Sequence, residues 1–257
     1  MPSGEWSRRE ALRQGGLLGL FLLAGCQQNQ RVEALPAPVR PGGAATPPMP
    51  PYRPGPPIAR RPGQPGYTPG GGGPVPDVLP RAAWTRQGVA STADINPMLP
   101  IGRITIHHDG MDGFTSTSQA DAAARLETIR RAHVNQRGYA DIGYHYIVDP
   151  GGRVWEGRNI RYQGAHVKDN NEGNVGVMCL GNFDLHRPSS AQIAALDRFV
   201  AGQMRRHNVG ISRVYTHQEI NPTACPGRNL QQYMVATRGN RGAMRLALIE
   251  MGGSALA

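Results

Sequence analysis

The stretch DIGYHYIVDPGGRVWEGR (141–158) gives the clearest indication of the fold. Two runs rich in β-branched and aromatic residues stand on either side of Asp149, Pro150 and two glycines. Residues of this kind around such a centre favour two strands joined by a tight turn. The stretch is therefore predicted to form a β-hairpin.

Strand and helix patterns alternate on both sides of this hairpin. Apolar β-branched runs predict strands, while Ser or Thr caps, helical apolar spacing and terminal glycines predict helices. The predicted strands are 102–110, 174–183 and the first part of 212–219, and the rest of 212–219 is predicted to be a loop. The predicted helices are 116–138, 189–210, 228–237 and 242–251, and the second of them is predicted to end at Gly210. This order indicates the α/β class, with a central mixed β-sheet flanked by helices.

Residues 27–78 depart from this pattern. They contain most of the 23 prolines, a run of glycines at 70–73 and few large apolar side chains. Such a segment cannot bury enough surface to offset the entropy lost on ordering. We predict a Pro/Gly-rich disordered tether over 27–78, followed by a single folded domain over 79–257.

Residues 1–26 have the features of an export signal. The apolar stretch 15–25 is too short to span a bilayer, and it ends in LAGC (23–26), which resembles a bacterial lipoprotein cleavage site with Cys26 as the point of lipid attachment. SRR (7–9) also resembles a twin-arginine export signal, and an ordinary cleaved signal peptide is the alternative. The next residue, Gln27, is not the aspartate that holds many Gram-negative lipoproteins in the inner membrane. By resemblance to that sorting rule, we expect an exported bacterial lipoprotein in the outer membrane, facing the periplasm.

The formal net charge is +10, and every basic residue except Lys168 is an arginine. No nucleic-acid-binding motif is present, nor is the alternation of arginine and aromatic residues that a stacking platform requires. We expect a cationic surface that is compatible with an anionic polymer or a membrane. The contact with the membrane is expected to be made through the lipid anchor. We expect no nucleic-acid partner, and a monomer.

Apart from Cys26, the chain has two cysteines, Cys179 and Cys225. In an exported protein they could form one disulfide. The alternative is that Cys225 binds a metal and Cys179 is a buried apolar residue. The apolar strand pattern around Cys179 favours the second alternative.

The stretch THQEINPTACPG (216–227) places His217 eight residues before Cys225, in a loop that two prolines restrict. A hydrolytic zinc site needs three protein ligands and one position left open for water. The imidazole and the thiol supply two ligands, and the spacing alone is too loose to be diagnostic.

A third ligand is available where the strand 102–110 ends in adjacent histidines, His107 and His108. Because side chains alternate across a strand, only one of the two faces a given site. His107 shares its face with Thr105, and His108 shares the apolar face of the strand. Periodicity does not decide between them, although a polar face turned toward a cleft would favour His107.

Four blocks together resemble a known family. In order, they are IHHDG (106–110), DIGYHYIVDPGGRVWEGR (141–158), GAHVKDNNEGNVGV (164–177) and THQEINPTACPG (216–227). They resemble the zinc-dependent N-acetylmuramoyl-L-alanine amidases that share a fold with animal peptidoglycan recognition proteins and a bacteriophage amidase-lysozyme. The resemblance covers about residues 79–233 and includes LPRAAW (79–84). It implies one amidase domain with zinc in a surface groove.

The resemblance also implies roles for single residues. These are Zn²⁺ binding for His107, His217 and Cys225, catalysis for Tyr144 and Thr223, and substrate binding for His166, Asn171 and His108. Packing is the alternative for Tyr144 and His108.

One departure from the family pattern concerns the general base. Some related amidases carry a glutamate on the central strand, at the position that here is Met178. Glu219 could substitute, but a structural role is favoured for it. By alternation His145 lies on the face opposite Tyr144, and it is expected either in the core or in contact with the residues that form the site. The identity of the base stays open.

The resemblance implies zinc-dependent hydrolysis of the amide bond between N-acetylmuramic acid and L-alanine in peptidoglycan, and with it a role in cell-wall turnover. One alternative is a non-catalytic peptidoglycan-binding module of the same fold, although such proteins typically lack the cysteine ligand. Another is a zinc hydrolase of a different amide, such as a free muropeptide. The export signal and the tether favour intact cell wall as the substrate.

Overall fold

A six-stranded sheet of order β1-β4-β3-β5-β2-β6 forms the centre of the fold. The computed structural model describes residues 78–91 and 95–252. The strands are β1 (Val78–Leu79), β2 (Arg103–His108), β3 (Tyr146–Val148), β4 (Val154–Glu156), β5 (Asn174–Cys179) and β6 (Val214–Thr216). Only the pair β3–β4 is antiparallel among the described strands, so the predicted mixed sheet is confirmed.

One residue that was assigned to the tether, Val78, belongs to a strand of the sheet. It lies in β1 and pairs with Val154. Trp84, at the end of the predicted LPRAAW block, is buried, and its indole N–H donates to the carbonyl of Glu156, 2.7 Å away. The predicted signal peptide, Cys26 and the rest of the tether lie outside the described residues.

The predicted hairpin is confirmed as β3 and β4. The carboxylate of Asp149 organises its turn: it accepts hydrogen bonds from the backbone N–H of Arg153 at 3.1 Å and from the indole of Trp155 at 2.9 Å. Gly152 has a φ of +81°, which a glycine adopts without strain. The turn residues therefore act by hydrogen bonding and backbone freedom, as the sequence pattern indicated.

Four helices of the described residues flank the sheet: α1 (Gln119–Arg137), α2 (Ser190–His207), α3 (Arg228–Thr237) and α4 (Ala243–Glu250). Serine hydroxyls cap the starts of α1 and α2, as predicted. The predicted end of α2 at Gly210 is wrong, because Asn208 already adopts the left-handed conformation, which asparagine tolerates. The predicted loop after β6 begins as a short 3-10 helix, η3 (His217–Glu219), and two further 3-10 turns are η1 (Arg81–Ala83) and η2 (Ile211–Arg213).

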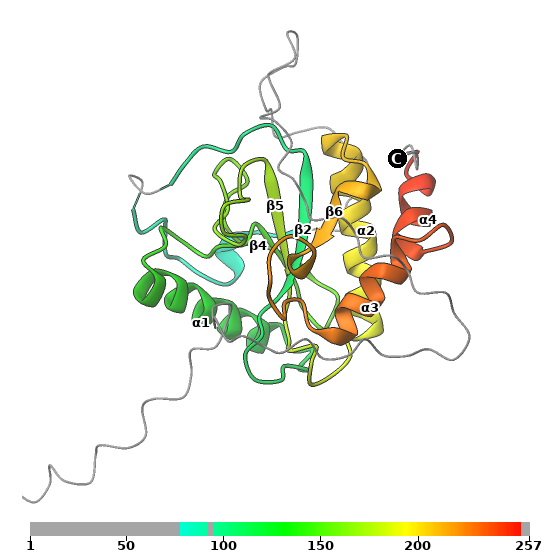
Figure 1. The fold of residues 1–257 in the computed structure, drawn as a ribbon. Coiled ribbons are helices and arrows are strands. Elements are labelled where there is room, and N and C mark those ends of the chain that lie inside the picture. The colour runs from blue at the N-terminus through cyan, green and yellow to red at the C-terminus, as the bar shows by residue number, and fades with distance from the viewer. Residues whose placement is uncertain (1–77, 92–94, 253–257) are drawn as a thin grey trace, which may run out of the picture.

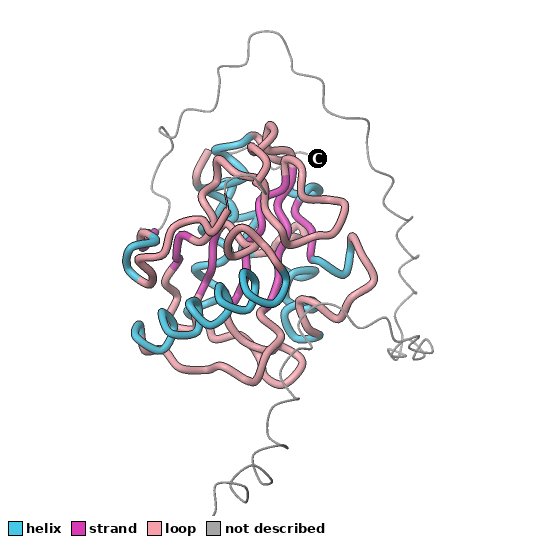
Figure 2. Tube along the Cα trace, turned by 90° about the vertical axis from the view of Figure 1, so that its left-hand side faces the viewer, coloured by secondary structure: helices cyan, strands magenta, loops and turns pink. Residues whose placement is uncertain are grey.

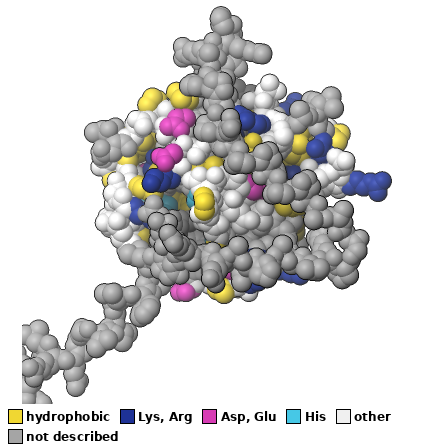
Figure 3. Space-filling model, in the orientation of Figure 1, with side chains coloured by type: hydrophobic (Ala, Val, Ile, Leu, Met, Phe, Trp, Pro, Cys, Tyr) yellow, Lys and Arg dark blue, Asp and Glu magenta, His cyan; other side chains and the backbone are white. Residues whose placement is uncertain are grey.

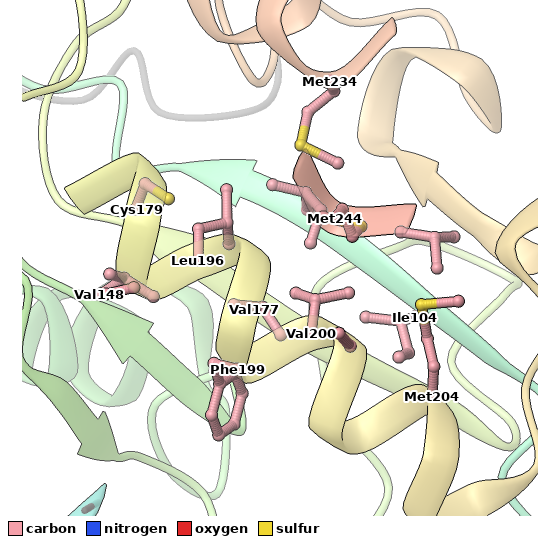
Figure 4. Close-up of a cluster of buried hydrophobic side chains, with 14 of the residues drawn as sticks. Ile104, Val148, Val177, Cys179, Leu196, Phe199, Val200, Met204, Met234 and Met244 are labelled. Carbon is pink, nitrogen blue, oxygen red and sulfur yellow. The ribbon is translucent and has the colours of Figure 1, made fainter. Parts of the chain in front are cut away.

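The helices cover the two faces of the sheet unequally. Figure 1 shows α1 on one side and α2, α3 and α4 on the other, and Figure 2 shows α1 crossing in front of the strands. The larger core joins β2 and β5 to α2, α3 and α4, through residues such as Val177, Leu196, Val200 and Met244 (Figure 4). The smaller core, which includes Tyr144 and Met178, lies against α1.

Cys179 and Cys225 are both buried and form no disulfide with each other, so the disulfide alternative is wrong for this structure. Within the described ranges, no helix combines the length and the apolar character needed to cross a bilayer. The side chains that Figure 3 colours by type include basic, acidic and apolar ones next to one another.

Candidate metal centre

The alternation of side chains along β2 directs His107 toward the α1 side of the sheet. Ile104 and Ile106 are fully buried in the larger core, on the α2 side. The ring of His107 instead packs at 5.1 Å, between centroids, from the ring of Tyr144 in the smaller core. His107 is thus the histidine of the pair that can join a site on this face.

A closed loop brings His217 and Cys225 together. The backbone N–H of Gln218 donates to the carbonyl of Cys225 at 2.9 Å, which joins the two ends of the loop. The hydroxyl of Thr223 accepts the backbone N–H of Cys225 at 3.2 Å and fixes the turn that carries the thiol. The eight-residue spacing between His217 and Cys225 therefore corresponds to one loop whose two ends are joined by a hydrogen bond.

Glu219 anchors this loop to the rest of the domain. Its carboxylate accepts hydrogen bonds from the N–H of Thr216 at 2.8 Å, from both terminal nitrogens of Arg238 and from Gln231. Burial alone would raise the pKa of Glu219, but the hydrogen bonds and the charge of Arg238 outweigh it and lower the pKa. The structural role favoured for Glu219 is confirmed, and all its partners belong to the scaffold.

His107, His217 and Cys225 form a buried cluster whose possible ligand atoms all lie within 4.8 Å of one another. Nδ1 of His107 lies 3.6 Å from Sγ of Cys225. Tetrahedral zinc, with Zn–N near ~2.0 Å and Zn–S near ~2.3 Å, places two such atoms about 3.5 Å apart. Nδ1 of His217 is buried and has no hydrogen-bond partner among the described residues. A buried nitrogen without a partner is costly, and a metal ion would satisfy it.

The protonation state of the cluster also suits a metal. Burial, and then the neighbouring His217 and His166, lower the pKa of His107 well below its ordinary value, so its ring is neutral at pH 7. Neutral imidazole is the form that binds metals. The backbone N–H of His108 points at Sγ of Cys225 from 3.4 Å, an arrangement that favours the thiolate. The donor set of two imidazoles and one thiol therefore fits zinc.

Tyr144 lies against the cluster and Thr223 lies within its loop. The Tyr144 ring is 6% exposed and packs between His107 at 5.1 Å and His133 at 5.6 Å. The Thr223 side chain is half-buried. Its hydroxyl can still donate a hydrogen bond, because its contact with Cys225 uses only the oxygen.

The residues predicted to bind substrate occupy three different environments. His166 is buried, and both its ring nitrogens lie within hydrogen-bond distance of protein atoms. The amide oxygen of Asn171 accepts two backbone N–H groups, those of His166 and Val167, both at 2.9 Å. His108 is buried on the other face, where its Nδ1 accepts the N–H of Phe183 at 3.4 Å. Their contacts with a substrate stay predictions.

Two other predicted positions are confirmed as part of the scaffold. Met178 is fully buried opposite His107 in the β2–β5 pairing, so no carboxylate stands at that position. His145 is fully buried, with its Nδ1 accepting the N–H of Gly176 at 2.9 Å. Burial lowers its pKa to about 4, so the ring stays neutral.

His133 of α1 also lies beside Tyr144 and was not predicted from the sequence. Its Nδ1 accepts the N–H of Gly143 at 3.0 Å, and its ring packs on Tyr144. Burial lowers its pKa to about 3. Its helical spacing from the buried residues Ile129 and Arg130, one turn earlier, could have indicated that it faces the sheet.

The fold and the cluster define an α/β protein with a candidate His-His-Cys metal centre at the end of a central strand. Residues 97–228 match the model of the N-acetylmuramoyl-L-alanine amidase family, and the chain belongs to this family.

Its relatives include enzymes and recognition proteins. It is 28% identical over 154 residues to the peptidoglycan-recognition protein SC2 of Drosophila melanogaster, covering 60% of this chain and 82% of that one. It is 31% identical over 158 residues to an N-acetylmuramoyl-L-alanine amidase of Sus scrofa, covering 59% of this chain and 26% of that protein.

Solved structures show the same fold. The bumblebee recognition protein PGRP-SA matches with a TM-score of 0.57 and 27% identity, covering 62% of this chain and 94% of that one. The ectodomain complex of the peptidoglycan recognition proteins LCa and LCx with bound tracheal cytotoxin matches with a TM-score of 0.53 and 30% identity, covering 59% of this chain and 90% of that one. These comparisons confirm the predicted fold and family.

Proposed function

We propose that this protein is a zinc-dependent N-acetylmuramoyl-L-alanine amidase that hydrolyses the amide bond between N-acetylmuramic acid and L-alanine in peptidoglycan. The observation that carries the proposal is the buried cluster of His107, His217 and Cys225, in which Nδ1 of His217 has no hydrogen-bond partner in the described part of the chain. Membership of the amidase family supports it. A solved relative, PGRP-LE, is described in complex with a monomeric diaminopimelic acid-type peptidoglycan, which supports the substrate class.

His107, His217 and Cys225 would hold the zinc, which when bound supplies a Lewis acid and a water of lowered pKa. The side chains around it would orient the substrate and stabilise developing charge. Tyr144 stands at the cluster, where its hydroxyl would donate a hydrogen bond to the oxyanion of the amide under attack. Thr223 would be a second neutral donor, from the loop that carries Cys225.

The main competing function is peptidoglycan binding without hydrolysis, as the names of several relatives suggest. The presence of Cys225 beside two histidines favours hydrolysis, because its sulfur, 3.6 Å from an imidazole nitrogen, completes the set of three protein ligands that a hydrolytic zinc site needs. A purified protein that binds sacculi but releases no peptide would establish the competing function.

The test is digestion of purified sacculi by the full chain, followed by mass spectrometry of the soluble products. Hydrolysis should release free stem peptides with an L-alanine amino terminus and leave glycan strands with unsubstituted muramic acid. A zinc chelator should abolish the release, and added zinc should restore it. Products cleaved at any other bond, or release that chelation leaves unchanged, would contradict the proposal.

We further propose that the protein works from a membrane, as a lipoprotein anchored at Cys26 in the outer membrane. The proposal is supported by the LAGC pattern at residues 23–26 and by the Pro-rich segment that follows it. A tether of 51 residues over 27–77 would average roughly 40 Å between its ends, at ~5–6 Å × √n. That reach would let the domain contact the wall while anchored.

A further inference from the structure

His107 contacts a second histidine that does not belong to the metal cluster. Nε2 of His107 lies 3.1 Å from Nδ1 of His166, and the two rings meet edge to face with their centroids 5.0 Å apart. Nε2 of His166 in turn lies 3.2 Å from the carbonyl oxygen of Asn174, the first residue of β5. These groups form a chain from the backbone of β5 to the candidate ligand.

The chain of contacts determines which nitrogen of His107 is left for a metal. A carbonyl oxygen only accepts hydrogen bonds, so Nε2 of His166 carries the hydrogen that it donates to Asn174. A neutral imidazole has one N–H, so Nδ1 of His166 is an acceptor, and Nε2 of His107 donates to it. The lone pair of His107 is therefore on Nδ1, the atom that lies 3.6 Å from Sγ of Cys225.

The fold holds the ring of His166 closely. A Cβ atom on Gly176, in β5, would stand 2.5 Å from Cδ2 of His166, and one on Gly164 would stand 2.4 Å from the same atom. Both distances are shorter than atoms tolerate, so the ring occupies space that only glycine leaves free. Asn171 fixes the backbone of His166 by accepting its N–H at 2.9 Å.

We propose that His166 is a positioning residue for the metal, holding His107 in the tautomer and orientation in which Nδ1 binds zinc. Both ring nitrogens of His166 are then hydrogen-bonded to the protein, one to His107 and one to Asn174, and neither is available to bind substrate. This inference rests on the zinc site of the proposed function. Hydrogen-bond partners that orient metal-binding histidines typically change metal affinity by about 10- to 100-fold when removed.

Zinc affinity of the purified full chain, measured by competition with a chromogenic chelator, tests the proposal. His166→Phe keeps a ring in the cradle but removes the acceptor, and should weaken zinc binding by about 10- to 100-fold. His166→Gln offers an amide oxygen to His107 and an amide N–H to Asn174, and should recover part of the loss. Gly176→Ala displaces the ring while leaving it chemically intact, and should also weaken binding.

His186→Phe is the matched control. His186 also has both ring nitrogens hydrogen-bonded, to backbone groups that include those of Phe114 and Arg187, and it lies outside the cluster. This variant should bind zinc as the unaltered chain does. Equal zinc affinity of the unaltered chain and His166→Phe would overturn the proposal.

A measurement on the unaltered chain keeps the proposal testable even where the variants misfold. Long-range ¹H–¹⁵N spectra of the full chain labelled in its histidines report which ring nitrogen carries the hydrogen. We expect His107 and His166 both to carry it on Nε2, and zinc to shift Nδ1 of His107. A hydrogen on Nδ1 of either ring would refute the positioning role. An unaltered chain that binds no zinc would instead refute the metal site itself.

Discussion

The hydroxyl of Tyr144 is the single group whose removal most directly tests the catalytic proposal. The ring is 6% exposed and packs between His107 and His133, at 5.1 and 5.6 Å. Phenylalanine would keep this packing and remove one oxygen. We therefore expect Tyr144→Phe to keep its zinc content and to melt within a few degrees of the unaltered chain.

The expected loss is in turnover. Removing one donor to a developing oxyanion costs up to about 1,000-fold in kcat, and the presence of a second donor, Thr223, reduces the loss toward about 10-fold. This range corresponds to about 1.4 to 4.1 kcal/mol of transition-state stabilisation. KM should change little, because the hydrogen bond strengthens only as charge develops.

The assay is the rate of stem-peptide release from sacculi, measured at equal zinc occupancy. Tyr139→Phe is the matched control, since the Tyr139 ring also packs on His133, at 5.4 Å between centroids, but has no ring contact with His107 among the described residues. It should keep normal turnover. Unchanged turnover in Tyr144→Phe would show that Tyr144 only packs, and a matching loss of zinc would show that its role is structural.

Three further variants probe the metal, the loop and the anchor. Cys225→Ser should lose the roughly one zinc per chain of the unaltered protein, because a serine hydroxyl stays protonated; elemental analysis that finds stoichiometric zinc would exclude Cys225 as a ligand. Glu219→Gln should lose about 1–3 kcal/mol of stability at pH 7. Because the pKa of Glu219 is lowered in the folded state, the stability difference between the two proteins should be present above pH 4.5, the ordinary pKa of a glutamate. It should disappear as the pH falls through the folded-state pKa, and melting curves recorded from pH 7 to pH 3 would follow this change. Cys26→Ala should move the protein from the membrane to the soluble fraction and abolish acyl labelling, and an unaltered chain found soluble and unlabelled would contradict the lipoprotein prediction.

Local patterns predicted most elements because their causes are local. The turn of the hairpin depends on Asp149 and its neighbours, and the start of α2 depends on the hydroxyl of Ser189, which accepts the N–H of Gln192 at 3.0 Å. The end of α2 was predicted wrongly because Asn208 and Gly210 can both terminate a helix, and local propensity does not choose between them. The strand order, with β2 between β5 and β6, depends on pairings across the chain that no local pattern reveals.

Ligand types and their spacing did not by themselves identify the metal ligands. The resemblance to the amidase family supplied the assignment. Alternation along β2 narrowed the choice to His107 or His108 but could not say which face carried the site. The contact between His107 and His166 spans 59 residues and depends on the space above Gly176. Such a contact follows from the register of β5 against β2, in which Gly176 pairs with Thr105, so sequence patterns could not predict it.

One strand, β2, joins the stability of the domain to its chemistry. Ile104 and Ile106 are fully buried in the larger core on the α2 side, and His107 turns to the α1 side, where the cluster forms. Cys225 reaches that strand from 118 residues away, with Sγ near both Nδ1 of His107 and the N–H of His108. The unfolded chain cannot hold these groups together, so zinc bound here would stabilise only the folded state. Packing of β2 in the core therefore both stabilises the domain and brings the metal ligands together.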